Sequence, residues 1–352
     1  MALGFEIIGT GHYVPGSPVT NDDLARVMTT SDDWIYQRSG IRQRHFAPEG
    51  VGASDLACEA SKRAIENAGI QPNDVDYILF ATMTPDYIFP GSGALLGAKL
   101  GISGVPALDI RQQCAAMLFA LQTIDGLIQT GAAKTILFVG AEAHAGFMPW
   151  KDWGALDPKN HREATPEDRA RADKHRALAV LFGDGAGAMV VRATDRDAGL
   201  RGIRVHSDGR RAEALHVPGG GFKTRPYWRP EMLADDLHIP RMDGKELFKF
   251  AVTKLPTTAR ELCKDKGISI DQIDWFLAHQ ANKRINEYIR DQLGVPPAKM
   301  PMNIDRFGNT SAGTIPILVD EELRKGTIKR GDTAMFLALG TGIHWGCALF
   351  KF

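Results

Sequence analysis

The chain has 352 residues, with 42 Lys or Arg, 42 Asp or Glu, and 44% hydrophobic residues. This length allows two full cores, and the balanced charge argues against nucleic-acid binding or a generally basic surface. No uninterrupted apolar run approaches the roughly 20 residues that a membrane span needs. We therefore expect a protein that has neither nucleic acid nor a membrane among its partners.

The N-terminal stretch from Met1 to Gly9 is apolar but lacks a preceding basic segment, so it predicts a first strand rather than a signal peptide. A cytoplasmic location is the simplest expectation. The chain contains four cysteines and no CxxC pair, which argues against a disulfide framework and against a zinc site. The sequence therefore predicts no metal.

An internal repeat organises the chain. Residues 64–86 predict a helix, a Gly-Ile turn, an Asp-rich connection and a buried strand, and residues 262–279 repeat this order. Residues 131–140 and 329–340 form a second matching pair, each a helix exit followed by a strand. A period of about 200 residues predicts two fused α/β halves with mainly parallel sheets covered by helices. We place these halves at residues 1–187 and 188–352.

Cys114 lies between a strand-like run, residues 105–110, and a helical run, residues 115–129, whose apolar positions recur at helical spacing. A thiol at a helix N-terminus faces unpaired backbone N–H groups and the positive end of the helix dipole. This environment can lower a cysteine pKa from roughly 8.5 toward 3.5–7.5. The position therefore predicts a nucleophilic cysteine.

The repeat also brings two second-half residues toward Cys114. Residues 308–312 occupy the matching place before another helical run, and His279 ends the strand that corresponds to residues 78–82. We expect Cys114, His279 and Asn309 near one pseudo-twofold position. The thiol could take an acyl group from a thioester, and His279 Nε2 and the Asn309 amide could hold a second thioester carbonyl as it becomes an enolate. Loss of CO2 from a malonyl thioester would form this enolate without a base.

Two irregular stretches interrupt this plan. Residues 144–175 contain Trp150, Trp153 and a charged run whose Thr165-Pro-Glu start predicts a capped helix. Residues 218–240 are rich in Gly and Pro and contain Tyr227 and Trp228. Long ordered insertions often act as lids or binding loops. We expect each stretch either to cover an acyl chain or to extend a dimer surface.

Four segments resemble the β-ketoacyl-acyl-carrier-protein synthase III family of the thiolase superfamily: Ser31-Asp-Asp-Trp-Ile-Tyr-Gln-Arg-Ser-Gly-Ile41, Phe182-Gly-Asp-Gly-Ala-Gly187, His279-Gln-Ala-Asn-Lys-Arg-Ile285 and Arg306-Phe-Gly-Asn-Thr-Ser-Ala312. The resemblance runs over nearly the whole chain and implies a thiolase-like, duplicated αβαβα five-layered fold in a homodimer. It also implies catalysis by the Cys-His-Asn trio. The implied reaction loads an acyl-CoA primer on the cysteine and condenses it with malonyl-acyl-carrier protein, without a cofactor.

The resemblance assigns further residues by position. It implies that the nucleotide and pantetheine arm of CoA lie against Trp34, Arg38, Arg176, Gly244 and Asn282. The implied oxyanion hole consists of the backbone N–H groups of Cys114 and Thr341, although glycine is usual at position 341. The acyl-pocket residues are Phe89, which in relatives reaches the neighbouring subunit, and Leu339. The basic rim that receives the acidic carrier protein comprises Lys249, Lys283 and Arg284.

Several related activities fit the sequence less well. Ala338 stands where a degradative thiolase needs a second cysteine, and Met83 stands where a hydroxymethylglutaryl-CoA synthase needs a glutamate. Residues 340–344 do not match the glycine-rich motif of a chalcone-type synthase. Head-to-head acyl-CoA condensation and acyl transfer to an alcohol or amine in a secondary-metabolite pathway stay open. A non-catalytic scaffold would typically lose the nucleophile, which this chain keeps.

The sequence does not determine which acyl group the protein accepts. The family's common Cys-Ala-Gly-Phe is replaced by Cys114-Ala-Ala-Met-Leu, so the acyl pocket does not follow from the resemblance. Primer length and branching, the pathway served, the role of residues 144–175 and the carrier of the extender unit stay undetermined at this point.

Overall fold

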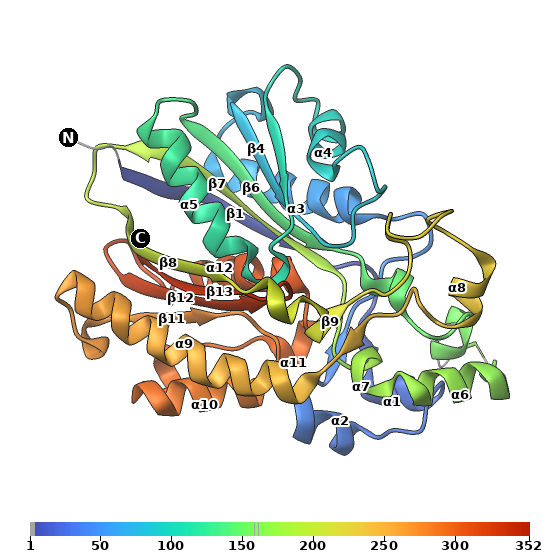
Figure 1. The fold of residues 1–352 in the computed structure, drawn as a ribbon. Coiled ribbons are helices and arrows are strands. Elements are labelled where there is room, and N and C mark those ends of the chain that lie inside the picture. Colours follow the sequence, from blue (N-terminus) through green and yellow to red (C-terminus); the bar gives the residue numbers. More distant parts are fainter. Residues whose placement is uncertain (1–3, 158, 161) are drawn as a thin grey trace.

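The computed structural model describes residues 4–157, 159–160 and 162–352. Two stacked sheets form its centre (Figure 1). The first sheet has the order β1 (Gly4–Tyr13), β7 (Gly185–Thr194), β6 (Thr135–Glu142), β4 (Tyr77–Ala81) and β5 (Ala107–Ile110). The second has the order β11 (Trp275–Ala278), β12 (Thr333–Gly340), β13 (His344–Lys351) and β8 (Gly199–Ser207).

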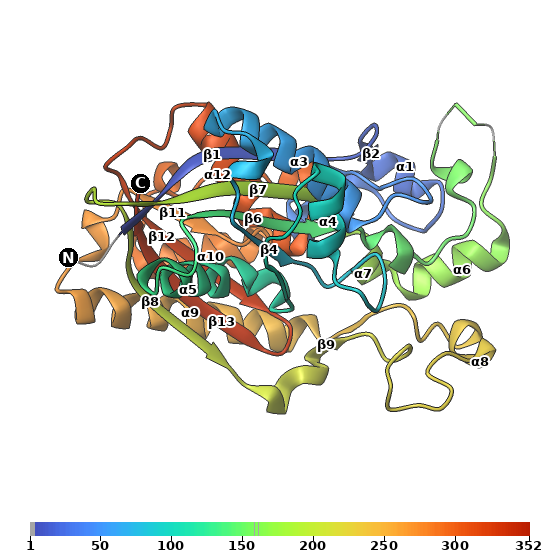
Figure 2. The same ribbon diagram turned by 90° about the horizontal axis from the view of Figure 1, so that it is seen from above.

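Helices cover both sheets and fill the space between them (Figures 1 and 2). The outer face of the first sheet packs against α3 (Ala53–Ala68) and α4 (Ser92–Leu100). The outer face of the second packs against α9 (Gly244–Lys266) and α10 (Lys283–Leu293). Between the sheets lie α5 (Ala116–Gln129) and α12 (Thr314–Arg324). The predicted five-layered αβαβα fold is thereby confirmed.

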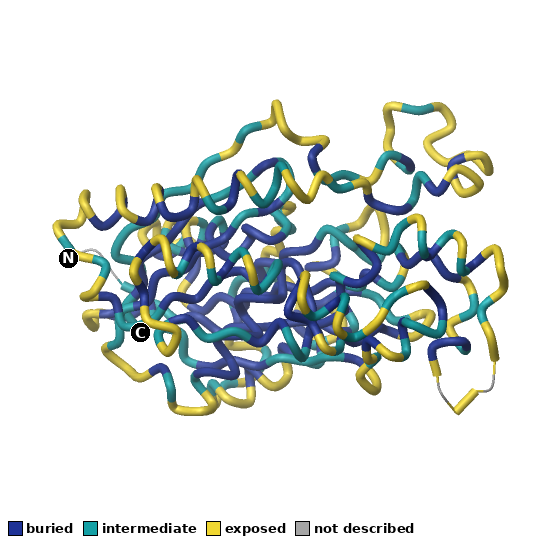
Figure 3. The backbone as a smooth tube through the Cα atoms, turned by 90° about the horizontal axis from the view of Figure 1, so that it is seen from below, coloured by how far each residue is buried: buried dark blue, intermediate teal, exposed yellow. Residues whose placement is uncertain are grey.

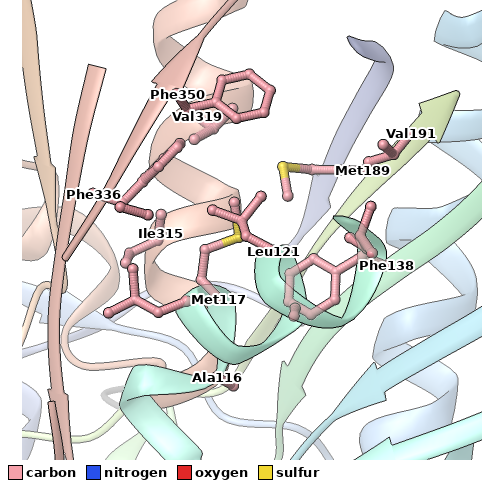
Figure 4. Close-up of a cluster of buried hydrophobic side chains, with 14 of the residues drawn as sticks. Ala116, Met117, Leu121, Phe138, Met189, Val191, Ile315, Val319, Phe336 and Phe350 are labelled. Carbon is pink, nitrogen blue, oxygen red and sulfur yellow. The ribbon is translucent and has the colours of Figure 1, made fainter. Parts of the chain in front are cut away.

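The central layer forms the main hydrophobic core (Figure 4). Met117 and Leu121 of α5 and Ile315 of α12 are buried at helical spacing, and they meet Phe138 of the first sheet and Phe336 of the second. Burying apolar surface on both sides of these two helices explains why their sequences are largely apolar. The core therefore ties the two halves into one unit.

The remaining elements are short and lie mostly at the ends of the sheets. The helices and strands are α1 (Asn21–Ala25), α2 (Asp32–Ser39), α6 (Pro166–Lys174), α7 (Arg176–Ala179), α8 (Pro230–Ala234), α11 (Ile304–Phe307), β2 (Val19–Thr20), β3 (Gln43–Arg44), β9 (Leu215–His216) and β10 (Arg241–Met242). Short 3₁₀ turns are η1 (Pro72–Asp74), η2 (Gln113–Ala115), η3 (His144–Phe147), η4 (Trp153–Leu156), η5 (Gly209–Ala214), η6 (Ile270–Gln272), η7 (Pro297–Lys299) and η8 (Ser311–Gly313).

The predicted repeat is visible in the strand order. Strands β1-β7-β6-β4 of the first sheet correspond to β8-β13-β12-β11 of the second, and each set pairs in the order antiparallel, antiparallel, parallel. The two Gly-Ile turns also match, because Gly69 ends α3 with φ 66° and Gly267 ends α9 with φ 65°. Glycine suits both left-handed positions. The structure is thus a duplicated α/β unit.

The structure bears on two details of the predicted organisation: the direction of the strands and the boundary between the halves. The expectation of mainly parallel sheets is wrong, because among the strands of the two main sheets in the described residues only β4 with β5 and β6, and β11 with β12, pair in parallel. The turn between β12 and β13 is too short for a crossover and forces the antiparallel return. The division expected after residue 187 falls within β7, which pairs along its length in the first sheet; the chain changes sheet between Thr194 and Gly199.

Each half packs a glycine of its sheet against a turn of the other half. An ideal Cβ on Gly140, in β6, would lie 2.1 Å from the carbonyl oxygen of Ala312 in η8. The equivalent residue Gly340, at the end of β12, would place a Cβ 2.6 Å from the carbonyl oxygen of Gln112, beside η2. At each of these glycines the backbone of the other half leaves no room for a side chain. The two contacts therefore interlock the halves.

We expect Gly140→Ala to lower the free energy of unfolding by about 2–3 kcal/mol, because backbone must move to admit the methyl group. Chemical denaturation would measure the loss. Gly126→Ala is the matched control: Gly126 lies in α5 and its ideal Cβ meets no atom within 4 Å, so alanine should stabilise the helix by about 0.5–1 kcal/mol. Equal stability of the two variants would contradict the interlock.

Candidate active site

A cavity of about 160 Å³ between the two halves brings Cys114, His279 and Asn309 together. The three side chains come from η2, the end of β11 and the segment before η8. Each is buried, with 5–7% of its surface exposed. The structure therefore assembles the trio that the repeat predicted, in a site largely shielded from water.

The turn η8 and the residue directly after it contact all three side chains of the trio. The backbone N–H of Ser311 donates to Asn309 Oδ1 at 2.8 Å, and Ser311 Oγ lies 3.4 Å from Cys114 Sγ. Thr314, the residue directly after η8, places its Oγ1 2.7 Å from His279 Nδ1. Because Asn309 Oδ1 already accepts a hydrogen bond, the amide is oriented to present its nitrogen as a donor.

The backbone of Asn309 is held by the segment that contains the Phe182-Gly motif. The Asn309 N–H donates to the Leu181 carbonyl at 2.8 Å, and the Gly183 N–H donates to the Asn309 carbonyl at 3.2 Å. The buried guanidinium of Arg44 donates to the Val180 carbonyl at 2.9 Å. This segment therefore fixes the backbone of Asn309, and Arg44 in turn holds the segment.

His279 is fixed and neutral. Its backbone N–H donates to the Leu337 carbonyl at 2.8 Å, and Asn286 Nδ2 donates to its carbonyl at 3.2 Å. Burial lowers the pKa of His279 to about 3. The imidazole is therefore uncharged near neutral pH and can serve as a neutral hydrogen-bond donor, as the sequence predicted.

Burial has the opposite consequence for the thiol. It raises the pKa of Cys114 to about 12; the hydrogen bond with Ser311 lowers this pKa and the charge of Glu142 raises it further. The expectation of a lowered pKa is wrong for this structure, because α5 begins only at Ala116 and the desolvation of the thiol prevails. Cys114 therefore rests as a protonated thiol.

Glu142 was not identified from the sequence. Its buried carboxylate, at the end of β6, accepts hydrogen bonds from the backbone N–H groups of Met83 at 3.0 Å and Thr84 at 3.1 Å, and from Thr84 Oγ1 at 2.6 Å. Burial raises the pKa of Glu142, while the hydrogen bonds from Thr84 and Met83 oppose that shift. The carboxylate ties the loop after β4 to the floor of the site.

Ser311 and Thr314 were missed for a simple reason. Both lie within the short segment that follows Asn309, and neither has a role that the sequence pattern predicts. Hydroxyl residues at the start of a helix usually cap it, and nothing in their spacing indicates that they face Cys114 and His279. Only the matching position of the cysteine-bearing turn in the repeat could have drawn attention to them.

The proposed oxyanion-hole residues lie close together. An ideal Cβ on Gly340 would approach the backbone nitrogen of Cys114 to 3.1 Å, so the end of β12 runs directly beside that N–H group. Thr341 follows Gly340, lines the cavity and donates its hydroxyl to the Leu215 carbonyl. The structure thus brings the backbone of residues 340–341 to the nucleophile.

The residues assigned to CoA form a second cluster beside the cavity. The Trp34 ring has two guanidinium groups near it, with Arg38 and Arg176 each 4.4 Å from its centroid. Asn282 Nδ2 donates to the Arg38 carbonyl at 2.8 Å. Asn282 and Gly244 line the cavity itself, whereas Trp34, Arg38 and Arg176 do not. Asn282 therefore connects the trio's cavity to the aromatic and cationic cluster.

Of the remaining predicted residues, some line the trio's cavity and others lie outside it. Leu339 lines the cavity, but Phe89 does not: it is 78% exposed in the loop between β4 and α4. Lys249 is exposed on α9, and Lys283 and Arg284 open α10. These two helices also supply cavity-lining residues such as Phe248 and Ile285, so the three cations lie on helices that border the cavity.

Further space extends from the trio on another side. A cavity of about 360 Å³ shares Phe182, Leu215 and Thr341 with the trio's cavity. It also shares Met83, Arg111, Phe147 and Val217 with a larger groove of about 1360 Å³. The three spaces therefore lie side by side and share wall residues.

Both irregular stretches border the large groove. Trp153 belongs to residues 144–175, of which 158 and 161 lie outside the described residues, and Trp228 belongs to residues 218–240. The predicted helix of the first stretch is present as α6, capped by Thr165. Both stretches lie at one end of the molecule (Figure 1), and residues 218–240 are mostly exposed, whereas residues 144–175 include buried side chains such as Trp150 (Figure 3).

One carboxylate joins the two stretches. Asp236 accepts from Lys174 Nζ at 2.8 Å and lies 3.1 Å from His175 Nε2 and 3.2 Å from Arg171 Nε. Burial acts to raise the pKa of Asp236, but the hydrogen bonds from Lys174 and His175 hold it below its usual range. The two stretches therefore form one bordering wall, a connection that the sequence did not reveal.

Within the described part of the chain, no helix is both long and apolar enough to cross a membrane. Among the same residues, no three His, Cys, Asp or Glu side chains are grouped so that they could hold a metal ion.

The chain is similar to known proteins over its whole length. It matches the family descriptions "Thiolase, N-terminal domain" over residues 37–147, "3-Oxoacyl-[acyl-carrier-protein (ACP)] synthase III" over 167–209 and the C-terminal part of the latter over 263–352. A β-ketoacyl-[acyl-carrier-protein] synthase III from Rhizorhabdus wittichii is 39% identical over 347 residues, which cover 98% of each chain.

A further protein of that name, from Neisseria gonorrhoeae, is 38% identical and aligns over 99% of each chain. The crystal structure of 3-oxoacyl-[acyl-carrier-protein] synthase III from Aquifex aeolicus is 34% identical. It superposes with a TM-score of 0.84 and covers 99% of this chain and 100% of its own. Fold and sequence therefore agree along the entire chain.

The raised pKa of Cys114 makes a kinetic prediction. Alkylation of Cys114 by iodoacetamide should be slow at pH 7 and accelerate about tenfold per pH unit to pH 10, because only the thiolate reacts. Peptide mass spectrometry would separate Cys114 from the other three buried cysteines. Ser311→Ala should slow the reaction further, since it removes the hydrogen bond that lowers the thiol pKa. A rate plateau below pH 9 would contradict the burial argument.

Proposed function

The chain belongs to the β-ketoacyl-[acyl-carrier-protein] synthase III family, and from this premise we propose that it joins an acyl-CoA primer to malonyl-acyl-carrier protein. It is a condensing enzyme of the acyltransferase type with a thiolase-like fold. The product would be a 3-oxoacyl-acyl-carrier protein. The observation that carries this proposal is the convergence of Cys114, His279 and Asn309 in one buried cavity.

In the first half-reaction, Cys114 sulfur attacks the thioester carbonyl of the primer and displaces CoA. The negative charge on the carbonyl oxygen of the intermediate is stabilised by the backbone N–H groups of Cys114 and Thr341. Collapse breaks the bond to the CoA sulfur, and the proton that leaves the Cys114 thiol is balanced by the proton that the CoA thiolate takes up. The primer is then an acyl thioester on Cys114.

In the second half-reaction, the malonyl thioester loses CO2 and the electron pair of the broken C–C bond forms an enolate. His279 Nε2–H and the Asn309 amide donate to the enolate oxygen, for which a neutral histidine is suited because its burial keeps it uncharged. The enolate carbon attacks the acyl-Cys114 carbonyl and releases the cysteine as a thiolate, which takes up one proton from solvent to restore the resting thiol. Because decarboxylation supplies the carbanion, the reaction requires no carboxylate base and no cofactor.

The outer clusters suit the two carriers. Trp34 with Arg38 and Arg176 would hold the CoA nucleotide by stacking and ion pairing, while Gly244 and Asn282 flank the pantetheine arm. Lys249, Lys283 and Arg284 would receive the acidic carrier protein at the entrance. A local cationic rim can steer an acidic partner although the whole chain is neutral.

The primer pocket is proposed to need a second copy of the chain. Strand β5 pairs only with β4 among the described strands, and exposed Tyr87, Ile88 and Phe89 lie in the loop after β4. An unpaired strand edge beside exposed apolar residues is suited to self-association. In such a homodimer Phe89 would reach the partner's acyl cavity and limit its length. A cytoplasmic location stays part of the same proposal.

Acylation and condensation should respond differently to two substitutions. Cys114→Ala should abolish covalent loading from acyl-CoA, because it removes the nucleophile. Asn309→Ala should load normally but slow decarboxylation of malonyl-acyl-carrier protein about a hundredfold or more, the usual cost of one oxyanion donor. Intact-protein mass spectrometry measures loading, and release of labelled CO2 measures the second step. Normal loading of Cys114→Ala would refute the assignment of the nucleophile.

The CoA assignment has a separate test. Trp34→Ala should raise the KM for acyl-CoA about tenfold, because the nucleotide loses its aromatic partner beside Arg38 and Arg176. The KM for malonyl-acyl-carrier protein, measured in the same steady-state assay, serves as the internal control and should change less than twofold. An equal rise in both constants would point to a folding defect and against a nucleotide site at Trp34.

A further inference from the structure

We propose that Thr314 is a positioning residue that keeps the ring hydrogen of His279 on Nε2, where the condensation step needs it. The inference rests on the proposed function, because it assigns a cause to the donor role of His279. Thr314 opens α12, is 2% exposed and places Oγ1 2.7 Å from His279 Nδ1. The same oxygen lies 3.0 Å from the carbonyl oxygen of Ser311.

The hydroxyl of Thr314 has one hydrogen and two acceptors within reach. When it donates to the Ser311 carbonyl, the ring must donate Nδ1–H to Oγ1, and Nε2 then carries no hydrogen. When it donates to Nδ1, the single hydrogen of the neutral ring stays on Nε2. The orientation of one hydroxyl group therefore decides whether His279 can donate to a substrate carbonyl.

The geometry favours donation to the histidine. A separation of 2.7 Å is the most common one for a hydroxyl donor and lies at the short limit of the 2.7–3.2 Å range for N–H donors, and it is shorter than the 3.0 Å from the same hydroxyl to the Ser311 carbonyl. The Ser311 carbonyl does not depend on the hydroxyl, because it already accepts the backbone N–H of Thr314 that closes η8. Donation to Nδ1 therefore leaves no buried group of this turn without a partner.

The consequence for the reaction is selective. Acylation of Cys114 uses the thiol and the backbone oxyanion hole, so it does not require a hydrogen on Nε2. Stabilisation of the enolate does require one. Loss of the Thr314 hydroxyl should therefore impair condensation and spare acylation, since valine fills the same space but cannot hold Nδ1 as an acceptor.

The test uses the full-length protein and measures the two half-reactions separately. Thr314→Val should slow labelled CO2 release from malonyl-acyl-carrier protein about ten- to a hundredfold. This slowing should not exceed the effect of removing a whole oxyanion donor. Its rate of acyl loading and its KM for acyl-CoA should stay within twofold. Thr314→Ser, which keeps the hydroxyl, should restore condensation to within threefold.

Thr258→Val is the matched control. Thr258 is also a buried threonine, and its hydroxyl donates to the Lys254 carbonyl at 2.8 Å in α9. It does not line the cavity. Both half-reactions of this variant should match those of the unmodified protein, whereas a selective loss of condensation there would show that removing any buried hydroxyl suffices and would overturn the proposal.

A spectroscopic readout addresses the hydrogen directly and does not need the variant to fold. The ¹⁵N spectrum of histidine-labelled protein, assigned by difference from His279→Ala, should show a protonated Nε2 and an unprotonated Nδ1. In Thr314→Val the two forms should mix. A hydrogen on Nδ1 of the unmodified protein would overturn the proposal, as would condensation by Thr314→Val at the normal rate. Failure of Cys114 to load would instead reject the proposed function.

Discussion

The site depends on one backbone constraint that occurs twice. Gln113 and Ser311 both adopt left-handed backbone conformations, with φ of 46° and 47°, directly before the helices that lie between the sheets. Such angles are unfavourable for residues other than glycine and persist only where surrounding structure enforces them. Here the enforcement comes from the other half: Gly340 packs beside η2, and Gly140 packs against η8. Without these contacts neither turn would aim its side chains at the cavity.

The two copies of the repeat carry different side chains at equivalent positions of their turns. By position, Cys114 in the first turn corresponds to Ala312 in the second, and Gln113 corresponds to Ser311. Under the proposed function, one turn supplies the sulfur nucleophile and its backbone N–H, and the other supplies groups that orient the reacting side chains. Burial then sets their protonation, since it neutralises His279 and protonates the Cys114 thiol. Catalytic asymmetry arises from side chains alone, on a nearly symmetric backbone.

Much of this arrangement could be predicted from the sequence because helical spacing, Gly-Ile turns and the repeat are local patterns. They located Cys114, His279 and Asn309. They could not show that β7 and β13 run antiparallel, because strand direction depends on distant segments. The pKa of Cys114 was mispredicted because a dipole rule for helix ends takes no account of burial. Ser311 and Thr314 were missed because the direction of a hydroxyl group is a tertiary property.

The surroundings of the trio differ from those of the large groove in how firmly their residues are held. The Asn309 and His279 side chains are held by buried hydrogen bonds with Ser311 and Thr314, so they have little freedom. The large groove is different, because its walls include the irregular stretches that carry Trp153 and Trp228. Buried Asp236 joins those stretches by pairing with Arg171 and with Lys174, whose side chain is 62% exposed. Because two cations from one stretch share a single carboxylate of the other, we expect the two stretches to stay together, and we expect acyl selection to follow the shape of this wall if the primer enters the groove.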